Sequence, residues 1–531
     1  MTARFPSSKI LPPVVASVLF ACVFYQLPLF SVNQHTYFLH GLAQAGYGQL
    51  AGDWLSHQAD HIPMFSWLVQ LIYRAGGDWM FYLLFGLLAA LYAASLARIA
   101  SSVSGTPSAS QSWQAQLFHL TLFMALLSLL HGAWLLGPLR NAGAGAGDPV
   151  AIIQRLASLA TNGMAGQTIL GHYLQPSSFG VFLLASLACF VMRREYAAIA
   201  CAVVAASVHP TFVLHAGILT VVYMLVLTTE GQTRQALTLG LLALLLVLPI
   251  VLYVLVKMQP ASASLLEQAN AILVDERIPH HARISAWLSR GTWLKLAIVV
   301  AGILVARRNR RLFLVLALCA AISAGLSLLQ WVSGSNGFAL LFPWRLSSWL
   351  VPACTAILLG ELTRLMIGAL QALPPRTATP ATAGAMALAL GIIVFTSTEG
   401  LQKTINGTFS SERDLLAQHA AGQGNAGQTY LIPLHYYSFR LAAGLPVFVD
   451  WKSHPFRDVE LLEWHERVRL ARDFYTASTS AGAAQALAAI QAHAPVTHIV
   501  VKSGDEQRLD LIDVEMLFRD EDKVLVKLGG G

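Results

Sequence analysis

Long apolar stretches separated by short polar segments occupy most of the chain before residue 400. A helix needs about 20 apolar residues to cross the hydrocarbon layer of a membrane, so the pattern predicts about eleven membrane-spanning helices. The predicted spans are 10–30, 79–98, 114–136, 178–192, 196–208, 210–228, 236–256, 292–306, 312–329, 346–365 and 382–398. His209-Pro210 interrupts 196–228, where one kinked helix or two short helices would fit. We predict two, because later Arg residues then fall on one side.

Lys and Arg residues gather at alternate ends of these stretches. The twelve that do so are Arg4, Lys9, Arg98, Arg193, Arg194, Arg234, Arg307, Arg308, Arg310, Arg311, Arg364 and Arg376. Positive charge collects in short cytoplasmic loops, which predicts a cytoplasmic N-terminus and an extracytoplasmic C-terminal segment. The long connections 31–77, 137–177 and 257–291 then lie outside with the tail, so we expect the working surface to face outward.

Composition excludes an ordinary water-soluble protein. Hydrophobic residues make up 56% of the chain and charged residues only 11%, against about 25% charged residues in a soluble domain. The net charge of +7 comes from the clusters at the helix ends, so we expect no nucleic-acid partner. All five cysteines lie inside apolar stretches without a CxxC pair, which disfavours a disulfide framework and a structural zinc site.

The sequence changes character after the last stretch and predicts two domains, 1–399 and 400–531. Short apolar runs at 430–433, 447–450, 498–501 and 524–526 are typical of strands, and 411–421, 456–477 and 482–493 of helices. Ser411 and Asp414 form a predicted capping box at the first helix. This alternation predicts a small extracytoplasmic α/β domain.

The long first outer loop, 31–77, carries candidate chemistry. If 48–61 is helical, Asp53, His57, Asp60 and His61 share one face. These two carboxylates and two imidazoles could hold a divalent cation, or supply a general base beside a positively charged partner. The alternative is an amphipathic helix at the membrane interface, whose polar face meets water.

Cationic side chains form two further groups, Arg277-Ile278-Pro279-His280-His281 and Phe342-Pro343-Trp344-Arg345. Arg matches phosphate oxygens bidentately, so both groups suit a phosphate or pyrophosphate. Lipid headgroup contact and helix-end anchoring are the alternatives. Isolated polar positions at His40, Gln175 and His209, and the tail pair Lys452 and His454, are open to packing or solvation as well as to ligand binding.

Several segments together resemble the GT-C superfamily of membrane glycosyltransferases, and more closely an uncharacterised bacterial branch of GT-C-like proteins. These segments are Asn33-Gln34, Tyr37 to Leu42, Asp53-Trp54, Gln175-Pro176-Ser177, His209-Pro210-Thr211, Arg277 to His281, Pro343-Trp344-Arg345 and Val449 to Pro455. The long first outer loop, the number of spans and the outer α/β domain add to the likeness. Unlike many GT-C members, this chain has no second acidic residue beside Asp53.

The resemblance implies roles for particular residues. Asp53 would be the general base, and Arg277, His280, His281 and Arg345 would contact the donor phosphate. His57 or Asp60 would complete a site for a divalent cation, Mg²⁺ or Mn²⁺. His40, Gln175, His209, Lys452 and His454 would line the rest of the cavity.

The function implied is transfer of a sugar from a polyprenyl-phosphate donor to a glycan or lipid acceptor, at the outer face of a bacterial inner (plasma) membrane. A transporter or flippase of a lipid-linked or anionic substrate is one alternative, although mid-membrane charge is sparse and no internal repeat is visible. A non-catalytic GT-C-like protein that binds glycan is another.

Overall fold

The computed structural model describes residues 11–103, 113–140, 148–410 and 414–529. Arg4, Lys9 and Ser411 lie outside these ranges, so the predictions that involve them are not described further. The chain divides into two compact units. Unit 1 comprises Met1–Leu27, Tyr82–Val251 and Ala271–Gly407, and unit 2 comprises Pro28–Phe81, Leu252–Asn270 and Thr408–Gly531.

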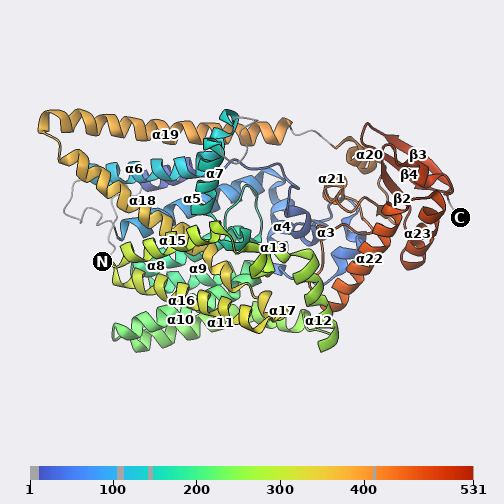
Figure 1. Ribbon diagram of the computed structural model, residues 1–531, viewed down its shortest axis with the longest axis horizontal. Helices are drawn as coiled ribbons and strands as arrows, with labels where there is room; N and C mark the ends of the chain where they lie inside the picture. Colours follow the sequence, from blue (N-terminus) through green and yellow to red (C-terminus); the bar gives the residue numbers. More distant parts are fainter. Residues whose placement is uncertain (1–10, 104–112, 141–147, 411–413, 530–531) are drawn as a thin grey trace. The chain divides into compact units, whose positions relative to one another are not determined.

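Unit 1 is built from helices, most of which run alongside one another, whereas the helix over Pro149–Thr161 lies across them (Figure 1). They are α1 (Leu11–Val23), α5 (Trp79–Ser101), α6 (Trp113–His131), α7 (Pro149–Thr161), α8 (Val181–Val191), α9 (Glu195–Val208), α10 (Val213–Thr229), α11 (Thr233–Lys257), α15 (Arg290–Ala306), α16 (Arg310–Ser333), α18 (Ser347–Gln371) and α19 (Pro375–Ser410). The short segments between them include η4 (Gly132–Leu139), η6 (Met164–Gly166), η7 (Pro176–Gly180), η8 (Pro210–Phe212), η9 (Ile272–Arg277), α13 (Pro279–Ala282), α14 (Ile284–Trp287), α17 (Asn336–Ala339) and η10 (Pro343–Leu346).

Every predicted apolar stretch contains a helix, which fits a multi-pass helical protein. Among the described residues, seven helical segments are long and apolar enough to cross a membrane. They are Trp79–Ser101, Trp113–Leu139, Pro210–Thr229, Thr233–Lys257, Arg310–Ser333, Asn336–Gln371 and Pro375–Thr408. Shorter apolar helices occupy Leu11–Val23, Pro176–Val191 and Glu195–Val208.

The chain forms two helices on either side of His209-Pro210, as predicted. Helix α9 ends at Val208, His209 is extended with φ −131° and ψ 99°, and α10 begins at Val213. Pro210 cannot donate the amide hydrogen bond that a continuous helix would need, so the first helix stops before it.

The cationic helix ends meet at one end of unit 1, which we call the basic end. Asn309 Nδ2 donates to the Ser102 carbonyl at 3.3 Å. Gly360 packs so closely on Ala100 that an added Cβ would lie 3.0 Å from the Ala100 Cβ. These contacts bring the end of α5 beside the loop after α15 and beside Gly360 in the middle of α18.

A buried ion cluster centred on Arg311 joins three helices at the basic end. Its guanidinium Nη1 donates to Glu195 Oε1 at 2.6 Å, and its Nε donates to Glu230 Oε1 at 2.7 Å. The Arg311 side chain is only 5% exposed. The guanidinium also lies over the Phe190 ring, 5.0 Å from its centroid. A desolvated guanidinium with two carboxylates fixes how α16 packs against α9 and the end of α10.

Replacing Arg311 by Met should destabilise the chain by about 3–5 kcal/mol, because Glu195 and Glu230 would lose their countercharge. Unfolding in detergent measures this. Arg364→Gln is the matched control, since its ion pair with Glu361 is exposed and should contribute at most about 1 kcal/mol. Equal stability of the two variants would contradict the assignment.

Unit 2 contains a four-stranded mixed sheet in the order β1-β2-β4-β3. Strand β1 (Tyr430–Leu431) pairs in parallel with β2 (His498–Lys502), and β4 (Lys523–Leu528) pairs antiparallel with β2 and with β3 (Val514–Arg519). The helices of the tail are α20 (Leu415–Gln423), α21 (Phe439–Ala443), α22 (Asp458–Thr476) and α23 (Ser480–His493), with the short turn η11 (Glu506–Leu509). Asp414 caps α20 by accepting from Ala417 N.

The tail is not a separate unit in this structure, because unit 2 also includes the first outer loop and residues 252–270. The loop forms α2 (Gln34–Tyr37), α3 (Leu39–Ala45) and α4 (Pro63–Gly76), and 252–270 ends in α12 (Ala263–Ala271). Gly48, with φ +53°, presses its Cα against the backbone of Gly444, where any side chain would collide. The unit boundaries therefore differ from the predicted division at residue 400.

Residues 48–61 do not form one helix, which was the condition for a shared polar face. Two separate turns form instead, η2 (Leu50–Gly52) and η3 (Trp54–His57), with extended backbone at Asp53. The Asp53 carboxylate accepts from Leu55 N and caps the second turn, as Asp does when it competes with helical hydrogen bonding. Asp53, His57, Asp60 and His61 consequently do not share one helical face.

Candidate functional site

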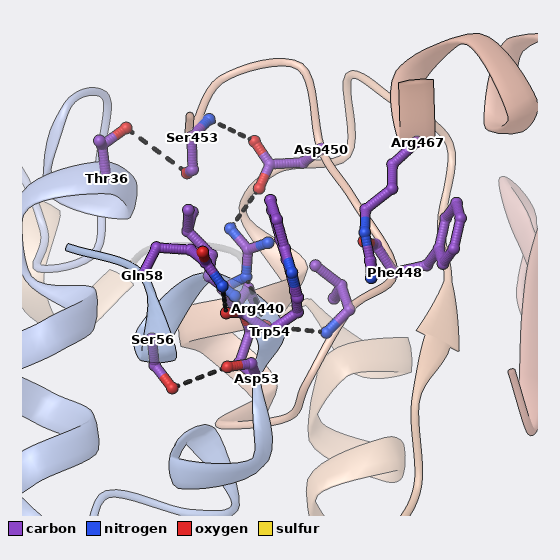
Figure 2. Close-up of polar contacts among 12 residues, drawn as sticks. Thr36, Asp53, Trp54, Ser56, Gln58, Arg440, Phe448, Asp450, Ser453 and Arg467 are labelled. Atoms are coloured by element: carbon purple, nitrogen blue, oxygen red, sulfur yellow. Dashed lines mark hydrogen bonds and ion pairs between the residues drawn. The ribbon is translucent and has the colours of Figure 1, made fainter. Parts of the chain in front are cut away.

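Asp53 lies at the centre of a buried polar network within unit 2 (Figure 2). It has no exposed surface. Its Oδ1 accepts from Leu55 N at 2.9 Å, and its Oδ2 accepts from Arg440 Nε at 2.9 Å and from Val447 N at 3.0 Å. Both carboxylate oxygens are therefore already engaged by donors, one from the loop and two from the tail.

Arg440 bridges Asp53 to a second buried carboxylate, Asp450. Its Nη1 forms an ion pair with Asp450 Oδ2, and its side chain is 3% exposed. The other oxygen of Asp450 accepts from Ser453 N at 2.6 Å. Trp464 Nε1 donates to the Asp450 carbonyl at 3.1 Å. Two carboxylates share one guanidinium, and backbone N–H groups donate further hydrogen bonds to the carboxylate oxygens.

This geometry does not support Asp53 as a general base. A base must reach a proton on the substrate, within about 3 Å. Asp53 instead faces the Arg440 guanidinium, which occupies its Oδ2. The side chain holds the first outer loop against the tail.

A second cationic side chain of the tail, Arg467, lies between two aromatic rings, one of which belongs to the loop. The Arg467 guanidinium lies 4.4 Å from the centroid of the Trp54 ring and 5.0 Å from that of Phe448. Its Nε donates to Glu463 Oε1 at 2.7 Å. Cation–π stacking of this kind stabilises a desolvated guanidinium. Figure 2 shows Arg467 between the two rings.

Imidazoles from the loop and the tail form another group in unit 2. The His61 ring lies 4.0 Å from the centroid of Phe456, and its buried Nε2 has no hydrogen-bond partner among the described residues. Burial, with a smaller contribution from the neighbouring His40 and His454, lowers the pKa of His61 to about 3, and Asp60 opposes this shift. The ring is therefore neutral at physiological pH.

The two predicted metal ligands, His57 and Asp60, do not form a metal site with other side chains of the described residues. His57 is exposed, and Asp60 Oδ1 accepts from Ile62 N at 2.9 Å. Within 11–103, 113–140, 148–410 and 414–529, no three His, Cys, Asp or Glu side chains are placed to hold a metal ion. The residues present do not fit the divalent cation that the resemblance implies.

Unit 1 brings the two predicted phosphate-binding segments together. His281 Nδ1 lies 2.6 Å from the Ala165 carbonyl. Arg345 Nη1 donates to Thr211 Oγ1 at 2.7 Å, and its guanidinium lies 4.6 Å from the Phe342 ring centroid. Ala165 and Phe342 belong to one apolar cluster, into which Ile278 also packs.

Arg277 and His280 lie on either side of Ile278 in the same segment, and the His280 and His281 rings are 4.1 Å apart. Arg277, His281 and Arg345 are half-buried, whereas His280 is exposed. We call Arg277, His280, His281 and Arg345 the cationic group.

Other predicted cavity residues have identifiable local roles. Gln175 caps η7 at the start of α8, and His209 occupies the break between α9 and α10, 5.1 Å from the Phe212 ring. The Lys452 carbonyl accepts from Thr36 Oγ1 at 3.4 Å. His40 Nε2 lies 3.2 Å from the Gln58 carbonyl.

Sequence reasoning missed Arg440 and Glu460, which the tail contributes to unit 2. Glu460 accepts from Ala59 N at 3.2 Å, and burial raises the pKa of Glu460. One signal for Arg440 was available in the sequence. A charged residue that stands between Phe439 and a short apolar run is a candidate for burial with a partner. It did not identify Asp53 as the partner, 387 positions away.

Arg440→Met should destabilise the chain by about 3–5 kcal/mol, because two buried carboxylates lose their shared countercharge. Asp53→Asn should cost about 1–3 kcal/mol, and the double variant should cost less than the sum. Chemical unfolding in detergent measures all three, with the exposed Arg469→Gln as control. Wild-type stability of Asp53→Asn combined with lost sugar transfer would instead restore the general-base role.

His61→Phe should reduce acid destabilisation of the protein. The folded-state pKa of His61, about 3, lies below the 6.5 of an unfolded chain. Unfolded chains therefore bind the extra proton, and stability falls as pH drops from 6.5 towards 3. Phe keeps the stacking on Phe456 and cannot be protonated, so the melting temperature should fall less between pH 6.5 and 4. His57→Gln, at an exposed position, is the control and should keep the wild-type dependence of melting temperature on pH. The same dependence in His61→Phe would refute the role of His61 in acid destabilisation.

The tail part of the network coincides with a known sequence family. Residues 418–471 match a domain of unknown function, DUF6798. This segment includes Arg440, Asp450, His454, Glu460 and Arg467, which contact or face the first outer loop within unit 2. No curated protein matches the chain.

Proposed function

We propose that this chain is a GT-C-like membrane glycosyltransferase, which transfers a sugar from a polyprenyl-phosphate donor to an extracytoplasmic glycan or lipid acceptor. The proposal places it in a bacterial inner membrane with the N-terminus in the cytoplasm and the tail outside. The observation that carries it is the convergence of the cationic group around one apolar cluster in unit 1. A lipid phosphate needs cations beside an apolar surface, and this site offers both.

Arg345 is the best-positioned contact for the leaving phosphate. Thr211 and the Phe342 ring fix its guanidinium, so little side-chain freedom remains to be lost when an anion binds. As the bond from the sugar to phosphate breaks, negative charge grows on the phosphate oxygens, and a fixed guanidinium stabilises that charge. His281 is likewise oriented by the Ala165 carbonyl.

A second candidate is a GT-C-like protein that binds the same donor without transferring its sugar. The burial of Asp53 favours this candidate, because its ion pair with Arg440 leaves that carboxylate engaged. In both cases Asp53 has a structural role and the cationic group binds phosphate. The two candidates differ in whether a product forms.

Arg345→Gln should weaken binding of a polyprenyl phosphate by about tenfold or more, since a hydrogen bond to a charged group contributes about 1.5–3 kcal/mol. Binding to the purified full-length chain can be measured by fluorescence titration. Arg290→Gln, an exposed position near the start of α15, is the matched control and should bind normally.

Wild-type affinity in both Arg345→Gln and Arg277→Gln would exclude this donor site. Incubation with a radiolabelled donor and a membrane extract as acceptor then separates the two candidates. A labelled product supports the transferase, and donor binding without a product supports the binding protein.

A further inference from the structure

A groove within unit 1 lies far along its helices from the cationic group. It has a volume of about 660 Å³ and runs between α1, α5 and α6. Along α5 its lining extends from Leu87 to Ser101, 14 steps that correspond to about 21 Å at 1.5 Å per residue. At one end of the groove, Ala100 packs against Gly360 of α18. Gly360 follows Arg345 by 15 residues, a distance of about 22 Å along a helix. The groove therefore opens at the basic end.

The lining of the groove changes from apolar to cationic along its length. Ala90, Ala94 and Ala97 follow one another along α5, with apolar side chains of α1 and α6 on either side. Arg98 and Ser101 close the series at the basic end, and Trp113 stands at the same mouth. Arg98 is exposed and forms no ion pair among the described residues. Tryptophan at the headgroup level and a cation beside it are typical of a lipid-facing boundary.

A buried polar atom in the groove lacks a partner. His119 lines the groove and is 8% exposed, and its Nε2 has no hydrogen-bond partner within the described ranges. It lies six residues into α6 from Trp113, about 9 Å from the mouth. Buried polar atoms in proteins are nearly always hydrogen-bonded, so this one calls for an exogenous partner.

We propose that this groove binds one molecule of an anionic glycerophospholipid from the leaflet at the basic end. The headgroup phosphate lies against Arg98, and a glycerol ester oxygen accepts a hydrogen bond from His119 Nε2. An acyl chain runs over Ala94 towards Leu87. The groove length favours a phospholipid, because its 21 Å matches the depth of one leaflet, about 15 Å of hydrocarbon plus the headgroup level. The charge of Arg98 selects an anionic headgroup.

This inference does not rest on the proposed glycosyl donor site. The groove and the cationic group share no residue. Loss of donor binding in Arg345→Gln would leave phospholipid binding unchanged, and the reverse holds for variants of the groove.

Native mass spectrometry of the full-length chain tests the proposal, with phosphatidylglycerol and phosphatidylcholine as probes. Wild-type protein should retain one phosphatidylglycerol in preference to phosphatidylcholine. Arg98→Gln should reduce that preference about fivefold, as expected for one cation near an anionic headgroup. Arg307→Gln, an exposed arginine at the same end, should keep the preference.

A second pair of variants tests the position of the acyl chain. Ala94→Trp fills the middle of the groove and should abolish retention, whereas Leu83→Trp, on the exposed face of α5 outside the groove, should not. Retention by a folded Ala94→Trp variant, or equal retention of both lipids with no effect of Arg98→Gln, would overturn the proposal. Displacement of phosphatidylglycerol by an equimolar polyprenyl phosphate would also overturn it, because the occupant would then be the carrier lipid.

Discussion

The shared guanidinium of Arg440 is the interaction on which unit 2 depends. Taking a carboxylate out of water costs several kcal/mol unless a countercharge and hydrogen bonds replace the lost hydration. Asp53 and Asp450 are both fully buried, and both meet this requirement through the same side chain. The first outer loop and the tail therefore form one folded body, because the countercharge of Asp53 comes from the tail.

The two units surround their charged side chains with different kinds of partner. In unit 2, buried charges are paired inside the protein, and the rings of Trp54 and Phe448 also cover Arg467, which pairs with Glu463. In unit 1, Arg345 is oriented by a neutral hydroxyl and a ring. Arg311 at the opposite end is neutralised by glutamates. The pairing of opposite charges is the physical reason to assign structural roles to Asp53 and Arg311.

Much of the fold follows from local sequence signals. The apolar stretches predicted where helices form, because length and hydropathy are local properties. His209-Pro210 predicted the break between α9 and α10, because proline acts on its own backbone. The strands at Tyr430, His498 and Lys523 were also anticipated. Strand β3 was missed, since Val514-Glu515-Met516-Leu517-Phe518-Arg519 lies half-exposed at the sheet edge and shows only weak alternation.

The site was harder to predict, because its partners are distant in the chain. The likeness of 48–61 to an amphipathic helix concealed the capping role of Asp53. Nothing near Asp53 identifies Arg440 as its partner, and nothing near His61 identifies Phe456. The cationic group was easier, since Arg277, His280 and His281 are adjacent in sequence and only Arg345 had to be brought to them.

The separation of Asp53 and Arg440 by 387 positions also sets the order of events during biosynthesis. A ribosome adds about 5–20 residues per second, so the loop emerges on the order of 20–80 s before its partner. Throughout that interval Asp53 must stay hydrated, or be shielded by a chaperone, while the intervening helices insert. Asp53 can consequently find its partner only late in synthesis, after the helices between Asp53 and Arg440 have been made.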